Sequence, residues 1–267
     1  MITLAPVGFY QFQILKKFPE LRQGISTKKF GDMRSTASTP RNIKNPETFF
    51  EKSHEELHNL MNFTQQLGVR IGNFAIPEQV HGGQVEEVIL GPYRDTTGEL
   101  FIQSVDGLVV DKKGLFLLVM VADCYPILAY DRQEQIIGIA HAGWRGVKAE
   151  IAKNLILKMK DLRAKSENIV AGVGPGICVN HYEVKSDIAA KFSAKGGPAN
   201  GWDFFVRNGK KVFLDLEKAI IYQLRNSGVR KENIEMAGVC VFENENFFSA
   251  RRDKTEDRFV VLIGMTE

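Results

Sequence analysis

The chain has 267 residues, of which 44% are hydrophobic and 25% are charged, a composition typical of a globular protein with a sizeable core. Its formal net charge is +3, and its basic pairs are scattered along the chain, so composition gives no indication of a nucleic-acid or membrane partner. The sequence lacks the roughly 20-residue apolar run of a membrane span. Its first residues do not resemble a signal peptide.

The chain has three cysteines, Cys124, Cys178 and Cys240. An odd number at wide spacing does not resemble a disulfide framework, so we expect a reducing, cytoplasmic setting. Thiols in that setting are available for metal binding or nucleophilic chemistry. We expect Cys178 and Cys240 to be small, buried apolar residues.

The N-terminal part of the chain combines a polar segment with one predicted helix. Residues 26–46 are polar and rich in turn residues, which predicts a long loop or short edge strands. A helix is predicted to begin at Asn45-Pro46. The apolar residues at helical spacing are Phe50, Leu57, Leu60, Met61 and Leu67.

From residue 105 onward, short apolar runs separated by Gly, Asp or Lys predict buried strands. The runs are VDGLVV, GLFLLVMVAD, QIIGIAHA, NIVAGVGPGI, KVFLDL, NIEMAGVCVF and RFVVLIG. Helices are predicted over 146–164 and 216–227, the first with Val147, Ile151, Leu155, Met159 and Leu162 on one face. This alternation indicates an α/β or mixed α+β fold, with mixed β-sheets flanked by helices in a single domain over 1–267.

Residues 54–58, HEELH, match the H-E-x-x-H template of helical zinc proteases. His54 and His58 are one turn apart, Glu55 would be the general base, and Glu78 could supply a third ligand. However, positions 61 and 64 hold methionine and threonine, where the longer form of the motif has glycine and histidine. We therefore favour a solvated face of an amphipathic helix.

A second set of candidate ligands is spread along the chain. His81, Cys124 and His141 each lie beside a turn signal at the end of an apolar run, so each can project from a strand end. Two imidazoles and a thiolate make a three-ligand zinc site whose fourth position is left for a water able to attack an electron-poor carbon. Their spacing is not diagnostic, and separate structural roles are equally compatible with it.

Two further interpretations concern the same residues. Cys124 could be a nucleophile activated by His141, as in a cysteine hydrolase. Asp123 could be a general base, a partner that orients a ligand, or a carboxylate hydrogen-bonded to loop amides.

Several strings between about residues 79 and 253 resemble those of one protein family. They are, in order, QVHG, DGLVV, ADCYPILAYD, AHAGWRGV, GPGICVNHYEV and SARRD. The sequence resembles the multicopper polyphenol oxidase, or laccase-domain, family. That family includes bacterial purine nucleoside phosphorylases also called peptidoglycan editing factor, and the mammalian laccase-domain-containing protein. Because unrelated strings coincide, the resemblance is more specific than a single short motif.

The resemblance implies zinc bound by His81, Cys124 and His141. It also implies phosphorolysis of adenosine, inosine, guanosine and 5'-methylthioadenosine, and deamination of adenosine, so the partners would be a purine nucleoside and phosphate. The oxidase label implies copper, but five histidines are too few for the several copper centres of a laccase. A non-enzymatic, zinc-stabilised binding protein is the remaining alternative.

Asp123 is one candidate catalytic residue. Phosphorolysis also requires an anion site, for which the sequence offers two arginines. Arg145 lies at the start of a predicted helix, where its charge and exposed amides could act together on an anion. Arg251, followed by Arg252, is the other cationic candidate, and both Arg145 and Arg251 could instead form structural ion pairs. We expect Trp144 to cap the core rather than to stack on a purine.

Overall fold

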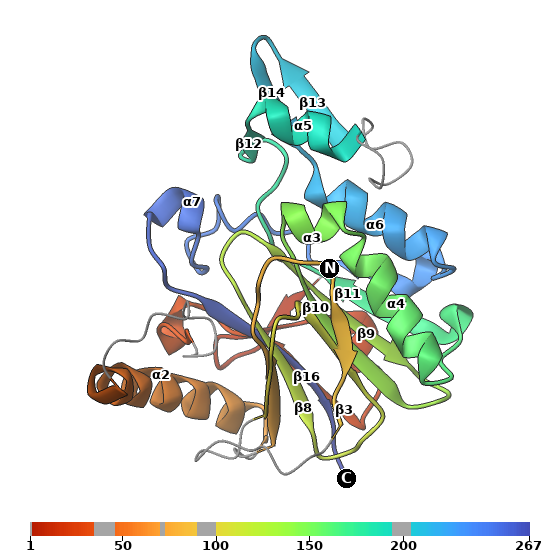
Figure 1. Cartoon of the computed structure of the whole chain (residues 1–267). Coiled ribbons are helices and arrows are strands. Elements are labelled where there is room, and N and C mark those ends of the chain that lie inside the picture. The colour runs from red at the N-terminus through yellow and green to blue at the C-terminus, as the bar shows by residue number, and fades with distance from the viewer. Residues whose placement is uncertain (1, 35–45, 70–72, 90–99, 194–203) are drawn as a thin grey trace.

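The computed structural model describes residues 2–34, 46–69, 73–89, 100–193 and 204–267. Two β-sheets lie at its centre (Figure 1). The first contains, in spatial order, β1 (Thr3–Leu4), β2 (Tyr10–Gln11), β3 (Leu21–Ile25), β16 (Phe259–Met265), β8 (Phe116–Val121), β4 (Phe74–Pro77) and β6 (Leu100–Ile102). The second contains β15 (Ile234–Met236), β11 (Ile169–Val173), β9 (Tyr125–Asp131), β10 (Ile136–Ala142), β7 (Gly107–Val110) and β5 (Val85–Glu87).

Both sheets are mixed, as the sequence predicts. In the first, β16 runs antiparallel to β3 and β8, whereas β4 runs parallel to β8 and β6. In the second, β10 is antiparallel to β7 and β9, whereas β5 is parallel to β7 and β15 to β11. The expected mixed α+β fold class is confirmed.

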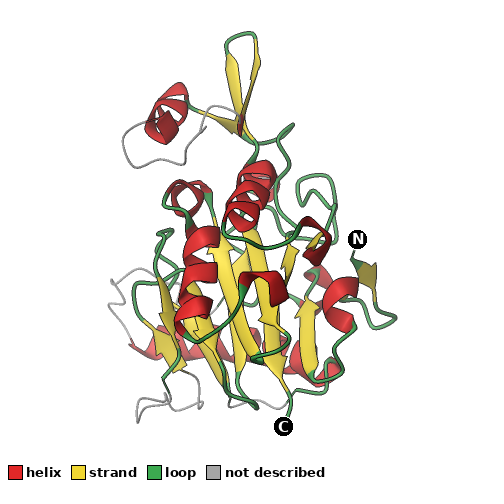
Figure 2. Ribbon diagram, turned by 90° about the vertical axis from the view of Figure 1, so that its right-hand side faces the viewer, coloured by secondary structure: helices red, strands yellow, loops and turns green. Residues whose placement is uncertain are grey.

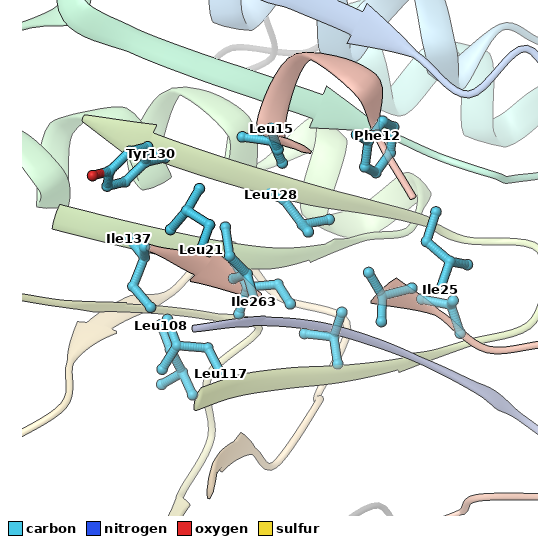
Figure 3. Close-up of a cluster of buried hydrophobic side chains, with 14 of the residues drawn as sticks. Phe12, Leu15, Leu21, Ile25, Leu108, Leu117, Leu128, Tyr130, Ile137 and Ile263 are labelled. Carbon is cyan, nitrogen blue, oxygen red and sulfur yellow. The ribbon is translucent and has the colours of Figure 1, made fainter. Parts of the chain in front are cut away.

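The main core lies between the two sheets (Figure 3). Leu117 and Ile263 of the first sheet pack in one cluster with Leu108, Leu128 and Ile137 of the second. Each of these side chains is fully buried. Several strands of both sheets are apolar along their whole length because both faces of each sheet are covered.

Helices cover the outer faces of the sheets, which gives helix, sheet, sheet and helix layers (Figures 1 and 2). On β8, Leu117 faces the core between the sheets, whereas Leu118 packs beneath α2 (Pro46–Gln66) with Leu60 and Phe63. This alternation follows from the two-residue period of a strand. On the other side, α4 (Ile151–Asp161) and α6 (Leu216–Asn226) cover the second sheet.

The remaining elements are short. A three-stranded sheet of β12 (Glu183–Val184), β14 (Lys211–Leu214) and β13 (Phe205–Asn208) projects from one end together with α5 (Ser186–Ser193), as Figure 2 shows. The other short helices are α1 (Gln13–Lys16), η1 (Lys28–Phe30), α3 (Trp144–Lys148), η3 (Ser166–Asn168), η5 (Lys231–Asn233) and α7 (Ala250–Asp253). Among the described residues, no helix combines the length and the hydropathy needed to cross a membrane.

The structure corrects the helix predicted over 146–164, which is two helices. The chain breaks after α3 at Glu150, whose φ is 60°, and α4 then begins. The Asn154 side-chain amide donates to the carbonyls of Gly83 and Ala149 (2.8 and 2.9 Å). These bonds connect the break to the distant turn that contains Gly83. Helical spacing continues across a break of this kind, so the apolar pattern alone did not reveal it.

Two other predicted segments differ in detail. Met61 is 46% exposed, because α2 packs through Leu60 and Phe63, and the residue after it, Leu67, packs in the same cluster. The strand expected over NIEMAGVCVF ends at Met236, and farther along Cys240 forms an isolated bridge with Gly176. The polar segment 26–46 contains η1, and its residues 35–45 lie outside the described residues.

Candidate metal centre

His81, Cys124 and His141 are brought together at one end of the two central sheets, and we call this group the first centre. Their ligand atoms all lie within 4.8 Å of one another. His81 lies between β4 and β5, and Cys124 lies between β8 and β9, so both occupy points where the chain passes from the first sheet to the second. His141 is on β10. The chain crossings therefore unite residues that are far apart in sequence.

Asp106, directly before β7, holds two of the three candidate ligands. Its buried carboxylate lies 2.8 Å from Nδ1 of His141. It also accepts backbone N–H bonds from Val80, His81 and Gly82 (3.2, 3.0 and 2.5 Å). These bonds support the positive φ of His81, 59°. Because Nδ1 of His141 is engaged, Nε2 is the nitrogen left for a metal.

Sequence reasoning missed Asp106 as a functional residue. The available signal was an aspartate inside the VDGLVV run, immediately before a buried strand. A buried carboxylate needs several hydrogen-bond donors, but the sequence does not say which donors it finds.

The thiol and the imidazoles of the first centre alter one another's protonation. Burial raises the pKa of Cys124, but the neighbouring His141 and His81 lower it to about 6. Burial lowers the pKa of His141, but Cys124 and Asp106 raise it to about 9. Together these shifts favour a thiolate and an imidazolium at neutral pH. The thiolate is the form of cysteine that binds metals.

Small residues make room for the first centre. A side-chain carbon on Gly143 would lie 2.9 Å from Sγ of Cys124 and 3.1 Å from Nδ1 of His81. A side-chain carbon on Gly146 would lie 2.7 Å from the carbonyl oxygen of Gly82. Both contacts are too short, so the glycines of GWRG allow α3 to begin against the ligand-bearing turn.

Asp123 lies next to Cys124 but is occupied by hydrogen bonds to another segment. Its carboxylate accepts from the Ser249 hydroxyl (2.6 Å) and from the backbone N–H of Arg251 (2.7 Å). Asp123 thus hydrogen-bonds to a backbone amide at the start of α7. The residue joins the β8–β9 turn to the start of α7.

Arg251 and Arg252 point to different surroundings. The Arg251 guanidinium lies over the Tyr182 ring, 5.3 Å from its centroid, and donates to the carbonyl of Glu183 (3.1 Å). Arg252 instead donates to the carbonyls of Val241 and Phe247 (2.7 and 2.6 Å). Arg252 therefore has a structural role, whereas Arg251 lies near Tyr182.

Asp253 at the end of α7 provides a prediction about stability. Arg252 donates two hydrogen bonds to its carboxylate (2.6 and 2.8 Å), which hold the pKa of Asp253 far below its ordinary value. A depressed carboxyl pKa contributes stability above the unfolded pKa of about 3.9, and this contribution is lost as pH falls below that value.

We therefore expect Asp253→Asn to lower the free energy of unfolding most at neutral pH. The difference from the wild type should shrink as pH falls below about 4. Urea unfolding between pH 3 and pH 7 measures this dependence. A difference that stays constant over the range would contradict it.

Trp144 and Arg145 border a cationic pocket beside the first centre. The pocket has a volume of about 550 Å³ and is lined by Trp144, Arg145, Lys148, Ala149 and Lys191. The Arg145 guanidinium is 4.5 Å from the Trp144 ring, and Trp144 is half-buried against the core beneath α4 and α6. The core-capping position expected for Trp144 is confirmed, and Arg145 is exposed.

Tyr182 is a second residue that sequence reasoning missed. Burial raises the pKa of its phenol above the ordinary value, and the negative charges of Cys124 and Asp123 act in the same direction. The positive charges of Arg251 and Arg145 oppose them. Tyr182 is therefore a neutral phenol whose pKa is affected by the charges of the first centre and of two nearby arginines.

The HEELH residues are not brought together with a third metal ligand among the described residues. His54, Glu55 and His58 are exposed on α2. Neither histidine belongs to a metal-ligating group found among the described residues. The interpretation as a solvated helix face is confirmed.

The expectation for Cys178 and Cys240 is wrong. Both are half-buried rather than buried, and they form a second group with His181 and Glu243. Their surroundings are polar because the side chains of His181 and Glu243 converge on both thiols, which the individual positions of the cysteines did not indicate.

The chain is similar to proteins of one family. Residues 35–266 match the family model described as "Multi-copper polyphenol oxidoreductase laccase". A Deinococcus radiodurans protein named "Purine nucleoside phosphorylase" is 36% identical over 200 residues, covering 74% of this chain and 73% of its own. "Adenosine deaminase RL5", from an unknown prokaryotic organism, is 35% identical over 198 residues, covering 72% and 74%.

Solved structures show the same fold. The Bacillus licheniformis hypothetical protein YfiH has a TM-score of 0.83 at 22% identity and covers 99% of both chains. YlmD from Geobacillus stearothermophilus has a TM-score of 0.79 at 24% identity, covering 100% of this chain and 99% of its own. With its model match over 35–266, the chain belongs to the multi-copper polyphenol oxidoreductase laccase family, whose relatives carry the names of purine nucleoside enzymes.

Proposed function

We propose that the protein is a zinc-dependent purine nucleoside phosphorylase that also deaminates adenosine. Adenosine, inosine, guanosine and 5'-methylthioadenosine are the proposed nucleosides, with phosphate as the second substrate. The observation that carries this proposal is the convergence of His81, Cys124 and His141 within 4.8 Å in a chain whose relatives are named for both activities.

The residues of the first centre fit zinc. One thiol and two imidazoles form a donor set that zinc accepts, and three protein ligands leave a position open. The lowered pKa of Cys124 supports binding as the thiolate, and Asp106 orients His141. When bound, zinc supplies Lewis-acid activation of a water molecule or of a substrate oxygen.

Nearby side chains are suited to the rest of the chemistry. Arg145, Lys148 and Lys191 line the cationic pocket, which suits the attraction of phosphate. We assign Arg251 the second cationic position, beside the first centre, because its backbone is bound to Asp123. The Tyr182 phenol stays protonated at neutral pH and is a candidate proton donor to the departing base.

In this assignment Asp123 acts as a positioning residue. Its carboxylate is held by the Ser249 hydroxyl and the Arg251 N–H, so it fixes the segment that carries Arg251. An Asp123→Asn variant should accordingly raise KM for phosphate more than it lowers kcat.

Chromatographic product analysis tests the proposed function. Adenosine is incubated with and without phosphate, using the wild type and Cys124→Ala. We expect adenine only when phosphate is present and inosine under both conditions, with neither product from Cys124→Ala. Absence of turnover of any purine nucleoside by the zinc-loaded wild type would overturn the proposal.

A cysteine hydrolase is the second candidate, because one observation favours it. Cys124, His141 and Asp106 lie in the order of a nucleophile, base and orienting carboxylate, with 2.8 Å between His141 Nδ1 and Asp106. The position of His81 beside the same thiol is not required by such a triad. A chelator should inactivate the zinc enzyme and leave a cysteine hydrolase active.

Copper is tested in the same way. After chelation, we expect Zn²⁺ to restore nucleoside turnover. Restoration of phenol oxidation by Cu²⁺, without nucleoside turnover in either metal, would favour the polyphenol oxidase alternative.

A further inference from the structure

A second group of metal-ligating side chains shares no residue with the first centre. Cys178 and His181 lie in the loop after β11, and Cys240 and Glu243 lie between β15 and α7. One ligand atom from each residue lies within 4.8 Å of the others. The proposed function uses none of these four residues, which we call the second centre.

The backbone presents the four side chains in two matching turns. The His181 N–H donates to the carbonyl of Cys178 (3.1 Å), and the Glu243 N–H donates to the carbonyl of Cys240 (3.2 Å). Each cysteine is therefore paired with a ligand three residues later. The two turns are joined directly, because the Cys178 N–H donates to Sγ of Cys240 (3.2 Å).

The distances between donor atoms are close to those around a tetrahedral zinc ion. His181 Nδ1 lies 3.3 Å from Sγ of Cys178, 3.9 Å from Sγ of Cys240 and 3.3 Å from Oε1 of Glu243. Sγ of Cys178 lies 3.8 Å from the same oxygen of Glu243. Zinc bond lengths with tetrahedral angles place such donors about 3.3–3.8 Å apart. Four of the six donor pairs therefore have spacings close to those of a tetrahedral zinc site, and all six lie within 4.8 Å.

The chemistry of the second centre selects the metal. Two sulfurs with an imidazole favour zinc over magnesium or calcium, which prefer oxygen ligands. The His181 ring is held by stacking on Phe242, with 4.4 Å between ring centroids and 15° between planes. Four protein ligands also fill a tetrahedral coordination shell, which is typical of structural rather than catalytic zinc.

We propose that Cys178, His181, Cys240 and Glu243 bind a structural zinc ion. This ion would fasten the loop after β11 to the segment that leads into α7. Both segments border the first centre, because the Ile177 N–H donates to the carbonyl of Asp123 (2.8 Å) and the Ser249 hydroxyl donates to its carboxylate. The second zinc therefore holds in place two segments that border the first centre. Its binding does not depend on the proposed function.

Metal counting after loading with Zn²⁺ and gel filtration tests the second centre. We expect two zinc ions per chain in the wild type and one in each of Cys124→Ser and Cys240→Ser. Glu245→Gln is the matched control, because Glu245 is exposed two residues from Glu243 and lies outside the second centre. This variant should retain both ions. If Cys240→Ser fails to fold, His181→Ala provides the same comparison.

Cobalt substitution in Cys124→Ser isolates the second centre with its ligands intact. Cys178 and Cys240 are then the only thiols in the chain, so a thiolate-to-cobalt charge-transfer band on adding Co²⁺ must arise there. We expect this band, together with a higher melting temperature after Zn²⁺ is added. A Cys124→Ser protein whose two free thiols react with a thiol reagent but bind neither metal would overturn the proposal. A Cys178–Cys240 disulfide in protein prepared with a reductant would also overturn it.

Discussion

Replacement of His141 by alanine should remove the metal from the first centre and lower kcat/KM for adenosine by more than about 100-fold. The reason is that loss of a residue that merely orients a ligand already costs about 10- to 100-fold in metal affinity or activity. His141 is 3% exposed and is bound to Asp106, so no solvent-exposed side chain can easily take its place. Zinc analysis and steady-state kinetics with adenosine and phosphate measure both effects.

His58→Ala is the matched control for His141→Ala. His58 is an exposed histidine on α2 and belongs to no metal-ligating group among the described residues. The control should retain metal and activity, and added Zn²⁺ should reactivate chelated wild type but not His141→Ala. A His141→Ala protein with a lower melting temperature but unchanged turnover would show that the centre is structural rather than catalytic.

Asp106→Asn should produce the second large effect, on both stability and metal affinity. The Asp106 carboxylate accepts three backbone N–H bonds and faces Nδ1 of His141, and none of it is exposed. An amide replaces one acceptor oxygen by a donor, so at least one of these charge-assisted bonds is lost. We expect a loss of about 3 kcal/mol in the free energy of unfolding. We also expect zinc affinity at the first centre to fall by about 10- to 100-fold.

Asp131→Asn separates the two effects. Asp131 is equally buried and also accepts three backbone N–H bonds, from Gln133, Glu134 and Lys165, at 2.8, 3.1 and 2.7 Å. It has no bond to His141, so its variant should lose stability but keep its zinc affinity. Equal zinc affinities in Asp106→Asn and Asp131→Asn would contradict the orienting role of Asp106.

Local sequence patterns predicted several elements of the fold correctly. The apolar runs of β8 and β10 predicted buried strands correctly, because strands covered on both faces need apolar residues at successive positions. The helix over 216–227 was also correct, and Asp215 caps it by accepting from the Lys218 N–H (2.9 Å). Helical spacing did not reveal the break at Glu150, since that break depends on contacts with Gly83 and Asn154.

The candidate ligands of the first centre could be predicted from the sequence because they lie in several motifs that occur together in one family. His81, Cys124 and His141 were named as candidate ligands, and the tertiary structure brings them together. Their roles remain predictions. Asp106 and Tyr182 lie in the same motifs, but nothing in the residue types distinguished them from other polar residues beside strands.

By itself, the sequence indicated the mixed α+β class, the buried strands β7, β8, β10, β11 and β16, the helices α2 and α6, and three candidate ligands, because apolar patterns, turn residues and motifs are local properties. The tertiary structure alone decided which distant side chains meet. The passage of the chain between two sheets at His81 and at Cys124 makes the first centre, and the union of two turns 62 residues apart makes the second. Such convergence depends on strand order and packing, which no local pattern encodes.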